Sequence, residues 1–284
     1  MKKAKLAGVF GLALLTSCGS GSTGSTDPSI KASDTSVREE VNSSGCKLKG
    51  SPYGGGNGKE SDPYLICSVA QLEAMAGSSS VSYFALTNDL DLANEKHLYL
   101  GTAITGVFDG RNHVIRNFNA HLEMNQEGGY LFGQTFTTNE LAAEIKNLKL
   151  ENFQIKTNSQ GGTAALVGTN GGKIINVHVT GNISGNHLVG GIVSNNFGII
   201  QDSSFSGSVQ GKEDVGGITG RAQGNSIAIR GCHVNGEVAG EKNIGGIVGD
   251  VENKLELTNN QVDAVVTGIT DSGQMFGKMK DNLL

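Results

Sequence analysis

Three aspartates near the start of a repetitive region are the residues best suited to chemistry: Asp89, Asp91 and Asp109. Glycoside hydrolysis uses a pair of carboxylates, so convergence of these residues would indicate a carbohydrate-active enzyme, either a polysaccharide lyase or a hydrolase. Each also occupies a position where Asp commonly serves a turn or a strand edge, as in Asp109-Gly110. We favour this structural interpretation and expect no catalytic residues.

Four cysteines offer the other reactive groups. Cys46 and Cys67 flank the Gly-rich stretch 54–56, and in a secreted chain this spacing predicts a disulfide, with two free thiols as the alternative. Such a bond would stabilise the fold by about 3 kcal/mol. Cys232 is interpreted as a small buried hydrophobe. The chain has no Cys-x-x-Cys and no His-Glu-x-x-His, so we expect no metal and no cofactor.

The N-terminal residues have the pattern of a targeting segment. A lysine-rich start precedes an apolar run over Leu6–Leu15, which is too short for a permanent membrane helix and fits a cleaved signal. The stretch Leu15-Thr16-Ser17-Cys18 resembles the bacterial lipobox, in which cleavage before the cysteine leaves its thiol acylated. We therefore expect a lipid anchor on Cys18, and Gly19 in place of Asp favours the outer membrane; an ordinary signal peptide is the alternative.

The segment after Cys18 is rich in Ser, Thr, Gly and charged residues and almost lacks apolar ones. It cannot bury enough surface to offset its conformational entropy, so a disordered tether is predicted. The sequence thus divides into a signal peptide (1–17), a flexible tether (18–50), an N-terminal cap with the first strands (51–110) and a repeat region (111–284).

A short phrase of glycines around an apolar pair recurs in the repeat region. It ends at positions 133, 168, 194, 220, 249 and 277, so after one longer interval the period is 26 to 29 residues. The glycines that define it are Gly133, Gly168, Gly191, Gly217, Gly220, Gly246, Gly249 and Gly277. A period in this range is typical of a solenoid. The 43 glycines and the aromatic content of only 5% suit a thin stacked core.

Two further columns of residues follow the same period. Apolar residues recur at Ile115, Ile145, Ile174, Ile200, Ile229 and Leu257. Two positions later stand Asn117, Asn147, Asn176, Asp202, Gly231 and Asn259. Asn, Asp and Gly tolerate positive φ, and stacked Asn side chains can hydrogen-bond between coils, so the second column predicts a corner.

These patterns predict an all-β fold: a β-solenoid, expected to be a right-handed β-helix, of about six coils with three short strands each. The glycine phrase is interpreted as the third strand, and the charged segment before it, for example Lys212-Glu213-Asp214, as an exposed loop with a ladder of alternating charge. Ser68–Gly77 has the capping residue and apolar stripe of a short helix, which we expect to cap the first coil.

The glycine phrase, the Ile-x-Asn step and the leader Phe108–Ile115 together resemble the GLUG-motif repeat proteins. This resemblance covers about residues 61 to 277. It implies relatives among bacterial surface proteins and the non-catalytic part of immunoglobulin A proteases, most of them surface-exposed or adhesin-like. The family has no catalytic motif to carry over.

The function expected is that of a non-enzymatic, surface-anchored lipoprotein that uses its solenoid for adhesion or for binding a glycan or protein. The alternatives are a carbohydrate-active β-helix enzyme and an envelope assembly protein. The net charge of −5 gives no reason to expect nucleic acid as a partner. Residues 278–284 show no capping helix, so self-association or a partner is expected at the last coil.

Overall fold

A computed structural model describes most of the chain after the tether. The described residues are 46, 52–77, 81–93, 103–122, 128–138, 141–158 and 160–279. The signal peptide, Cys18 and nearly all of the tether lie outside them. Within the described part, no helix has the length and apolar character required to cross a membrane.

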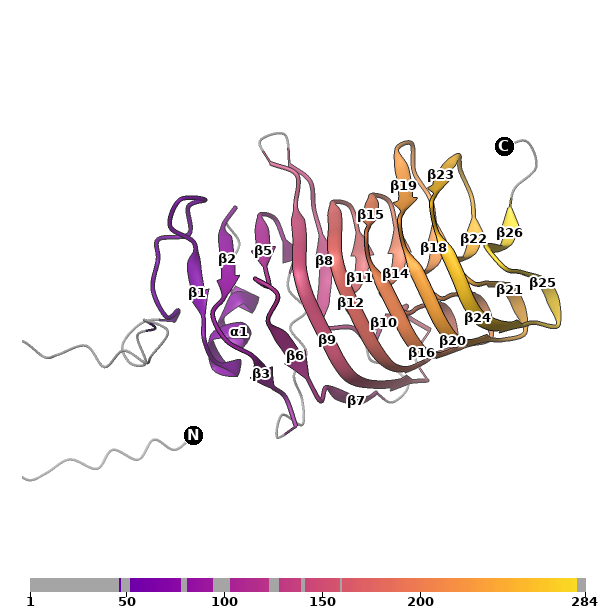
Figure 1. The fold of residues 1–284 in the computed structure, drawn as a ribbon, viewed down its shortest axis with the longest axis horizontal. Coiled ribbons are helices and arrows are strands. Elements are labelled where there is room, and N and C mark those ends of the chain that lie inside the picture. The colour runs from indigo at the N-terminus through magenta and orange to yellow at the C-terminus, as the bar shows by residue number, and fades with distance from the viewer. Residues whose placement is uncertain are drawn as a thin grey trace, which may run out of the picture. The chain divides into compact units, whose positions relative to one another are not determined.

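The described residues form a β-solenoid of about six turns, with three sheets that contain only parallel pairs between named strands (Figure 1). The predicted fold class is confirmed. The largest sheet has 14 strands, and its main path is β1 (Tyr64–Ile66), β2 (Tyr83–Leu86), β5 (Val107–Asp109), β9 (Glu144–Thr157), β12 (Lys173–Ser184), β15 (Ile199–Gln201), β19 (Ile227–Arg230) and β23 (Leu255–Thr258). Beside this path lie β3 (Leu90–Asp91), β6 (Val114–Arg116), β7 (Asn119–Leu122), β16 (Ser204–Gln210), β20 (His233–Ala239) and β24 (Gln261–Thr267).

Two smaller sheets form the other sides of the solenoid, and the five-stranded one begins only at β10 (Thr163–Ala164). It continues with β13 (His187–Gly190), β17 (Glu213–Gly216), β21 (Lys242–Gly245) and β25 (Thr270–Gly273). The seven-stranded sheet contains β4 (Ala103–Ile104), β8 (Phe132–Thr135), β11 (Val167–Asn170), β14 (Val193–Asn196), β18 (Thr219–Ala222), β22 (Val248–Val251) and β26 (Phe276–Met279).

A short helix lies at the end of the solenoid where β1 and β2 begin the large sheet (Figure 1). It comprises α1 (Val69–Ala74) and the 3₁₀ turn η1 (Met75–Gly77). Ser68 is the N-cap, because its hydroxyl accepts a hydrogen bond from the Gln71 amide at 3.3 Å. Leu72 and Met75 are fully buried, so the helix covers the start of the core with its apolar stripe.

One continuous hydrophobic core fills the solenoid. In the later coils it is built from columns: Ile145, Ile174, Ile200 and Ile229 pair in direct register and are fully buried. In the first coils it is built from larger rings, as in the contact between Phe108 and Phe132, whose centroids are 5.3 Å apart. The columns from Ile145 onward therefore have the predicted alignment.

The alignment predicted for the first coil is wrong. Ile145 pairs with Phe108, whereas Ile115 pairs with Leu150. The long strand β9 bends and pairs with three separate segments, β5, β6 and β7, so Ile115 belongs to a later part of its coil than Ile145 does. This coil is longer than the repeat, with 37 residues from Phe108 to Ile145, and Ile115 lies seven residues after Phe108, so the 30-residue spacing of the two isoleucines matched the repeat by coincidence.

The corner column has left-handed backbone at each of its non-glycine members. The φ angles are 62° at Asn117, 51° at Asn147, 54° at Asn176, 50° at Asp202 and 57° at Asn259. The side chains also connect coils, since Asn176 Nδ2 donates to Asn147 Oδ1 at 2.9 Å. Asn117 belongs to a second corner, because it accepts from Asn152 Nδ2 at 2.8 Å rather than stacking on Asn147.

The glycine phrase crosses a corner and does not form the third strand itself. Gly216 ends β17 and Thr219 begins β18, so the phrase leads from the five-stranded to the seven-stranded sheet. A Cβ atom at Gly217 would collide with the Gly246 carbonyl oxygen of the next coil, which explains the glycine. The charged segment predicted as a loop is strand β17, whose Glu213 pairs with Lys242 of β21.

Candidate functional site

The N-terminal coils carry an extra hairpin that the later coils lack within the described residues. A disulfide joins Cys46 to Cys67 beside it. Gly54 packs against this bond so closely that a Cβ there would collide with both sulfur atoms. The hairpin is closed by the Gly54 amide, which donates to the Leu65 carbonyl at 2.8 Å, and by the Leu65 amide, which donates to Gly55 at 3.0 Å.

The tip of this hairpin is fixed against the large sheet. The amides of Asn57 and Gly58 donate to the Asp62 carbonyl at 3.0 and 3.1 Å. The Tyr83 amide of β2 donates to the Gly58 carbonyl at 2.9 Å. Gly58 has φ of 79°, and a Cβ there would collide with the ring of Tyr64. The hairpin therefore stands at a defined position over the outer face of the first strands.

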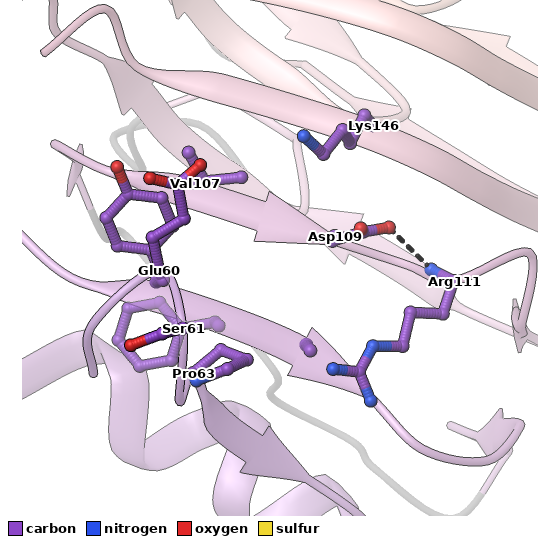
Figure 2. Close-up of a pocket in the computed structure, with 10 residues that line it drawn as sticks. Glu60, Ser61, Pro63, Val107, Asp109, Arg111 and Lys146 are labelled. Carbon is purple, nitrogen blue, oxygen red and sulfur yellow. Dashed lines mark hydrogen bonds between the residues drawn. The ribbon is translucent and has the colours of Figure 1, made fainter. Parts of the chain in front are cut away.

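Between the hairpin and the sheet lies an open pocket with a volume of about 250 Å³ (Figure 2). Its lining combines the hairpin, β2, β5, the turn after β5 and the start of β9. The lining residues are Glu60, Ser61, Pro63, Tyr83, Phe84, Ala85, Val107, Asp109, Arg111 and Lys146. The pocket thus brings together charged groups of both signs and an aromatic ring, all of which come from segments distant in sequence.

The turn after β5 positions two of the charged groups. The His113 amide donates to the Gly110 carbonyl at 2.8 Å, with Arg111 and Asn112 between them at φ of 49° and 64°, as in a type I′ turn. Asp109 Oδ1 accepts from the Arg111 amide at 2.9 Å and from Asn147 Nδ2 at 3.1 Å. Figure 2 shows the Arg111 side chain extending from this turn, away from Lys146.

Some charged side chains of the pocket form ion pairs and others do not. Lys146 Nζ lies 2.7 Å from Glu144, and the hydrogen bond between them raises the pKa of the lysine. Among the described residues, the Glu60 carboxylate and the Arg111 guanidinium have no hydrogen bond or ion pair with another side chain. Both side chains are exposed, so they remain available to a ligand.

The structure brings Asp89 and Asp91 together, but Asp109 contacts other residues. Asp89 Oδ1 accepts from the Val114 amide at 3.0 Å, and Arg116 lies 3.4 Å from its other oxygen. Both oxygens of Asp91 accept from Asn117 Nδ2 at 3.0 Å.

These contacts also set the titration of both carboxylates. The Val114 amide holds the pKa of Asp89 below its usual value, and the Asn117 amide does the same for the pKa of Asp91. A general acid in glycoside hydrolysis requires a raised pKa, so this pair has the electrostatics of a structural cluster.

A second charged cluster joins the two smaller sheets. Asp214, predicted in an exposed loop, is only 2% exposed; it pairs with Arg221 and accepts from Asn243 Nδ2 at 2.6 Å. Arg221 also lies 3.5 Å from Asp250, and burial raises the pKa of Asp250. The prediction of a solvated loop was wrong because Asp214 sits at a left-handed corner, with φ of 55°, which turns its carboxylate inward.

Two further features concern metal binding and the free thiol in the described part of the chain. No cluster of three or more His, Cys, Asp or Glu residues there could hold a metal ion. Cys232 is buried, and this burial raises the pKa of its thiol to about 11, as suits an inert core residue.

Sequence reasoning did not find the pocket. Glu60, Tyr83, Arg111 and Lys146 lie in four segments whose juxtaposition depends on the shifted register of the first coil. One local signal was present. The turn Asp109-Gly110-Arg111-Asn112 places a long cationic residue where type I′ turns ordinarily use Gly, Asn or Asp.

The repeats and the parallel sheets define the class of protein: a β-solenoid that contains the GLUG motif. The family model described as the GLUG motif matches residues 185–210, which lie in the regular later coils. The predicted GLUG-repeat solenoid is confirmed by this match together with the structural comparison below.

Similar proteins of known name come from two different organisms. The chain is 29% identical to halomucin of Haloquadratum walsbyi, over 61% of this chain and 2% of halomucin. It is 28% identical to the immunoglobulin A1 protease of Streptococcus pneumoniae, over 50% of this chain and 7% of that protein. The chain therefore spans only a small share of the curated relatives that it matches.

A solved structure shares the fold. It is that of a candidate immunoglobulin A1 protease from Bacteroides ovatus, with a TM-score of 0.67 and 25% sequence identity. The match covers 80% of this chain and 74% of that one. The solenoid described here is thus similar over most of its length to an architecture known from crystallography.

Proposed function

We propose that the protein is a non-enzymatic surface protein whose β-solenoid binds a glycan or protein partner, as in adhesion. The observation that carries this proposal is the pocket of the first coils, where Glu60 and Arg111 face solvent without partners among the described side chains. A fixed concave site with a few convergent polar groups is the usual form of a binding site. The similarity to halomucin and to proteins named for immunoglobulin A1 supports a role outside the cell.

The binding test uses a soluble form that retains residues 19–284. This protein is applied to an array of glycans and matrix proteins. We expect saturable binding to at least one class, reduced by substitutions in the pocket such as Asp109→Asn. An array without any ligand above background would overturn the proposal.

The proposed location is the outer membrane, through a lipid on Cys18 after removal of residues 1–17. The support is the lipobox-like stretch before Cys18 and the Gly that follows it. Cys18→Ser is expected to release the protein from the membrane fraction, and mass spectrometry of the N-terminal peptide should show acyl chains. An unmodified Cys18 in membrane-associated protein would contradict this anchor.

A hydrolytic or lyase activity is the second candidate, because two of the relatives are named as proteases. Pectin, alginate, chitin-type polymers and immunoglobulin A1 are suitable substrates for the assay. Turnover that survives His113→Ala but is lost with Asp91→Ala would assign the chemistry to the aspartate cluster. We expect no turnover, since Asp89 and Asp91 are held by hydrogen bonds in their ionised form.

A structural role in assembly is the third candidate, and its support is the last described coil. Val265 of β24 is 67% exposed and the nearby Ile269 is 78% exposed. In the described part of the chain, no strand pairs with the outer edges of β24 and β26. We propose that a second copy covers this end. Sedimentation should show a dimer that Val265→Lys converts to monomer, and a concentration-independent monomer would reject the proposal.

A further inference from the structure

The pocket of the first coils is small. Its volume is about 250 Å³, below the roughly 300–1,000 Å³ of sites for drug-sized ligands. It is open to solvent, and the hairpin forms one wall while strands β2 and β5 form the floor. A terminal sugar could enter while the rest of a glycan remained outside.

The lining of the pocket contains both hydrogen-bond acceptors and donors. Asp109 uses only Oδ1 for its hydrogen bonds to described residues, which leaves Oδ2 able to accept. Glu60 is a second acceptor, and the exposed Arg111 guanidinium supplies donors in a planar fork. Adjacent hydroxyl groups both donate and accept, so a vicinal diol can bind a carboxylate and a guanidinium at the same time.

The charge balance favours a neutral ligand. Glu60, Asp109 and Glu144 are three carboxylates in or beside the pocket, whereas Arg111 and Lys146 are its two cations. Lys146 is already occupied by Glu144 at 2.7 Å. An anionic sugar would therefore bring its carboxylate into a region with a net charge of about −1.

The walls supply the apolar contact that a pyranose requires. Tyr83 and Pro63 are half-buried and line the pocket, and Val107 lies on its floor. The C–H faces of a sugar ring pack well against an aromatic ring, while its hydroxyl groups point to the polar side chains. The lining thus matches both surfaces of a pyranose.

The backbone of Arg111 supplies an independent indication. A φ of 49° is uncommon for a long side chain, and such strained positions cluster at functional sites. Gly or Asn would form the same turn without this cost. The turn alone therefore does not account for an arginine at this position.

From these observations we infer that the pocket binds one neutral pyranose residue, with the vicinal hydroxyls held by Asp109, Glu60 and Arg111 and the ring packed on Tyr83. This inference rests on the proposed binding function and names its ligand class. The Cys46–Cys67 disulfide keeps the hairpin wall in place, so the site exists before the ligand arrives.

The test is a titration of residues 19–284 with methyl glucoside, methyl galactoside, methyl mannoside and glucuronate, followed by calorimetry or NMR. We expect at least one neutral pyranoside to bind and glucuronate to bind more weakly than methyl glucoside. Arg111→Gly should weaken binding by about tenfold or more, because it removes charge-assisted hydrogen bonds. It should not lower the thermal midpoint, since Gly adopts positive φ without strain.

The matched control is Asn112→Gly, which changes the same turn but does not line the pocket. Its affinity should stay within about twofold of wild type. Unchanged affinity in Arg111→Gly, tighter binding of glucuronate, or no binding of any pyranoside would each overturn the inference. A ligand found on the array that binds Arg111→Gly normally would reject this pocket but leave the broader binding proposal standing.

Discussion

The first coils and the later coils use their surface polar residues in different ways. In the later coils these residues are matched across neighbouring strands: Glu213 faces Lys242, and Arg230 lies 2.7 Å from Glu256. In the first coils the register shifts, an extra hairpin covers the sheet, and Arg111 and Glu60 have no described side-chain partner. Matched pairs also occur in the first coils, as between Asp89 and Arg116, but the two unpartnered charges of the pocket lie where the hairpin interrupts the repeat.

The difference also has a geometric consequence. Identical coils stacked in register produce flat lateral faces, and a flat face offers little concave surface to a small ligand. The pocket arises where the hairpin over β2 and β5 interrupts that regularity. In repeat proteins, departures from the repeat are therefore the places to search for a site.

The largest expected effect is the loss of stability when a buried aromatic ring is removed. It tests whether the first coils and the later coils share one core. Phe108 is fully buried against Phe132, and in the later coils Phe205 is buried at 1% exposure, in the column that continues Leu150 and Val179. Each Phe→Ala substitution should lower the free energy of unfolding by about 3–5 kcal/mol. Chemical denaturation measures this loss. Phe136→Ala, at a ring that is 44% exposed, should cost much less, and equal losses would argue against the described core.

The disulfide should matter only to the first coils. Cys67→Ser removes the bond to Cys46 and is expected to cost about 3 kcal/mol, since it frees a loop of 21 residues. Thermal denaturation with and without a reductant measures the effect. Reductant should lower the midpoint of wild type but leave that of the variant unchanged. Equal sensitivity in both proteins would show that another bond is responsible.

In the corner column, the cost of a substitution in stability should depend on whether the new residue tolerates positive φ. Asn176 has φ of 54° and donates to Asn147. Asn176→Ala is expected to cost about 1–2 kcal/mol, because alanine disfavours the left-handed region. Asn176→Gly should cost less, as the column already contains glycine at Gly231. A larger loss in the Gly variant would show that the hydrogen bond, and not the backbone, dominates.

The smallest expected effects are changes in folding stability with pH. They have opposite signs in the first coils and the later coils. The pKa of Asp89 is lowered from 3.8 by the Val114 amide, so its ionised form stabilises the fold above about pH 3.8, and this contribution is lost as pH falls through the lower folded value. The pKa of Asp250 is raised from 3.8 by burial, so its ionised form costs stability at neutral pH, and acidification toward 3.8 relieves that cost.

Two amide variants separate these contributions. Asp89→Asn should be less stable than wild type at pH 7, and Asp250→Asn more stable, with both differences shrinking in acid. Thermal midpoints between pH 7 and about pH 3 give the measurement. If both variants shift the midpoint in the same direction at pH 7, the contrast between the two carboxylates is wrong.

The regular coils could be predicted because each column repeats the same kind of residue at a fixed period, and a single physical requirement accounts for that residue. The column from Ile145 to Ile229 needs only a buried β-branched side chain, and Asn176 needs only a tolerated φ. Ile115 was misplaced because its spacing mimicked the repeat while its pairing was set by the bend in β9. Asp214 was misplaced because a charged residue at a left-handed corner points inward to Arg221.

The candidate site could not be predicted in the same way. Its residues share no period, and they meet only after the hairpin of residues 54–65 is placed over β2 and β5. That placement depends on the disulfide and on the contact between Tyr83 and Gly58, which are single long-range interactions. The cysteine spacing indicated the disulfide, but the backbone hydrogen bond between Tyr83 and Gly58 leaves no pattern in a sequence read without relatives.

The parallel pairing of successive coils also makes the rod extensible. Each coil presents to the next the same arrangement of strands that it received from the previous one. Duplication of a segment of 26 to 29 residues would therefore lengthen the rod by about 4.8 Å without disturbing the hairpin at the other end. The reach of the molecule and the chemistry of its pocket can thus evolve independently, one by copying coils and the other by point substitution.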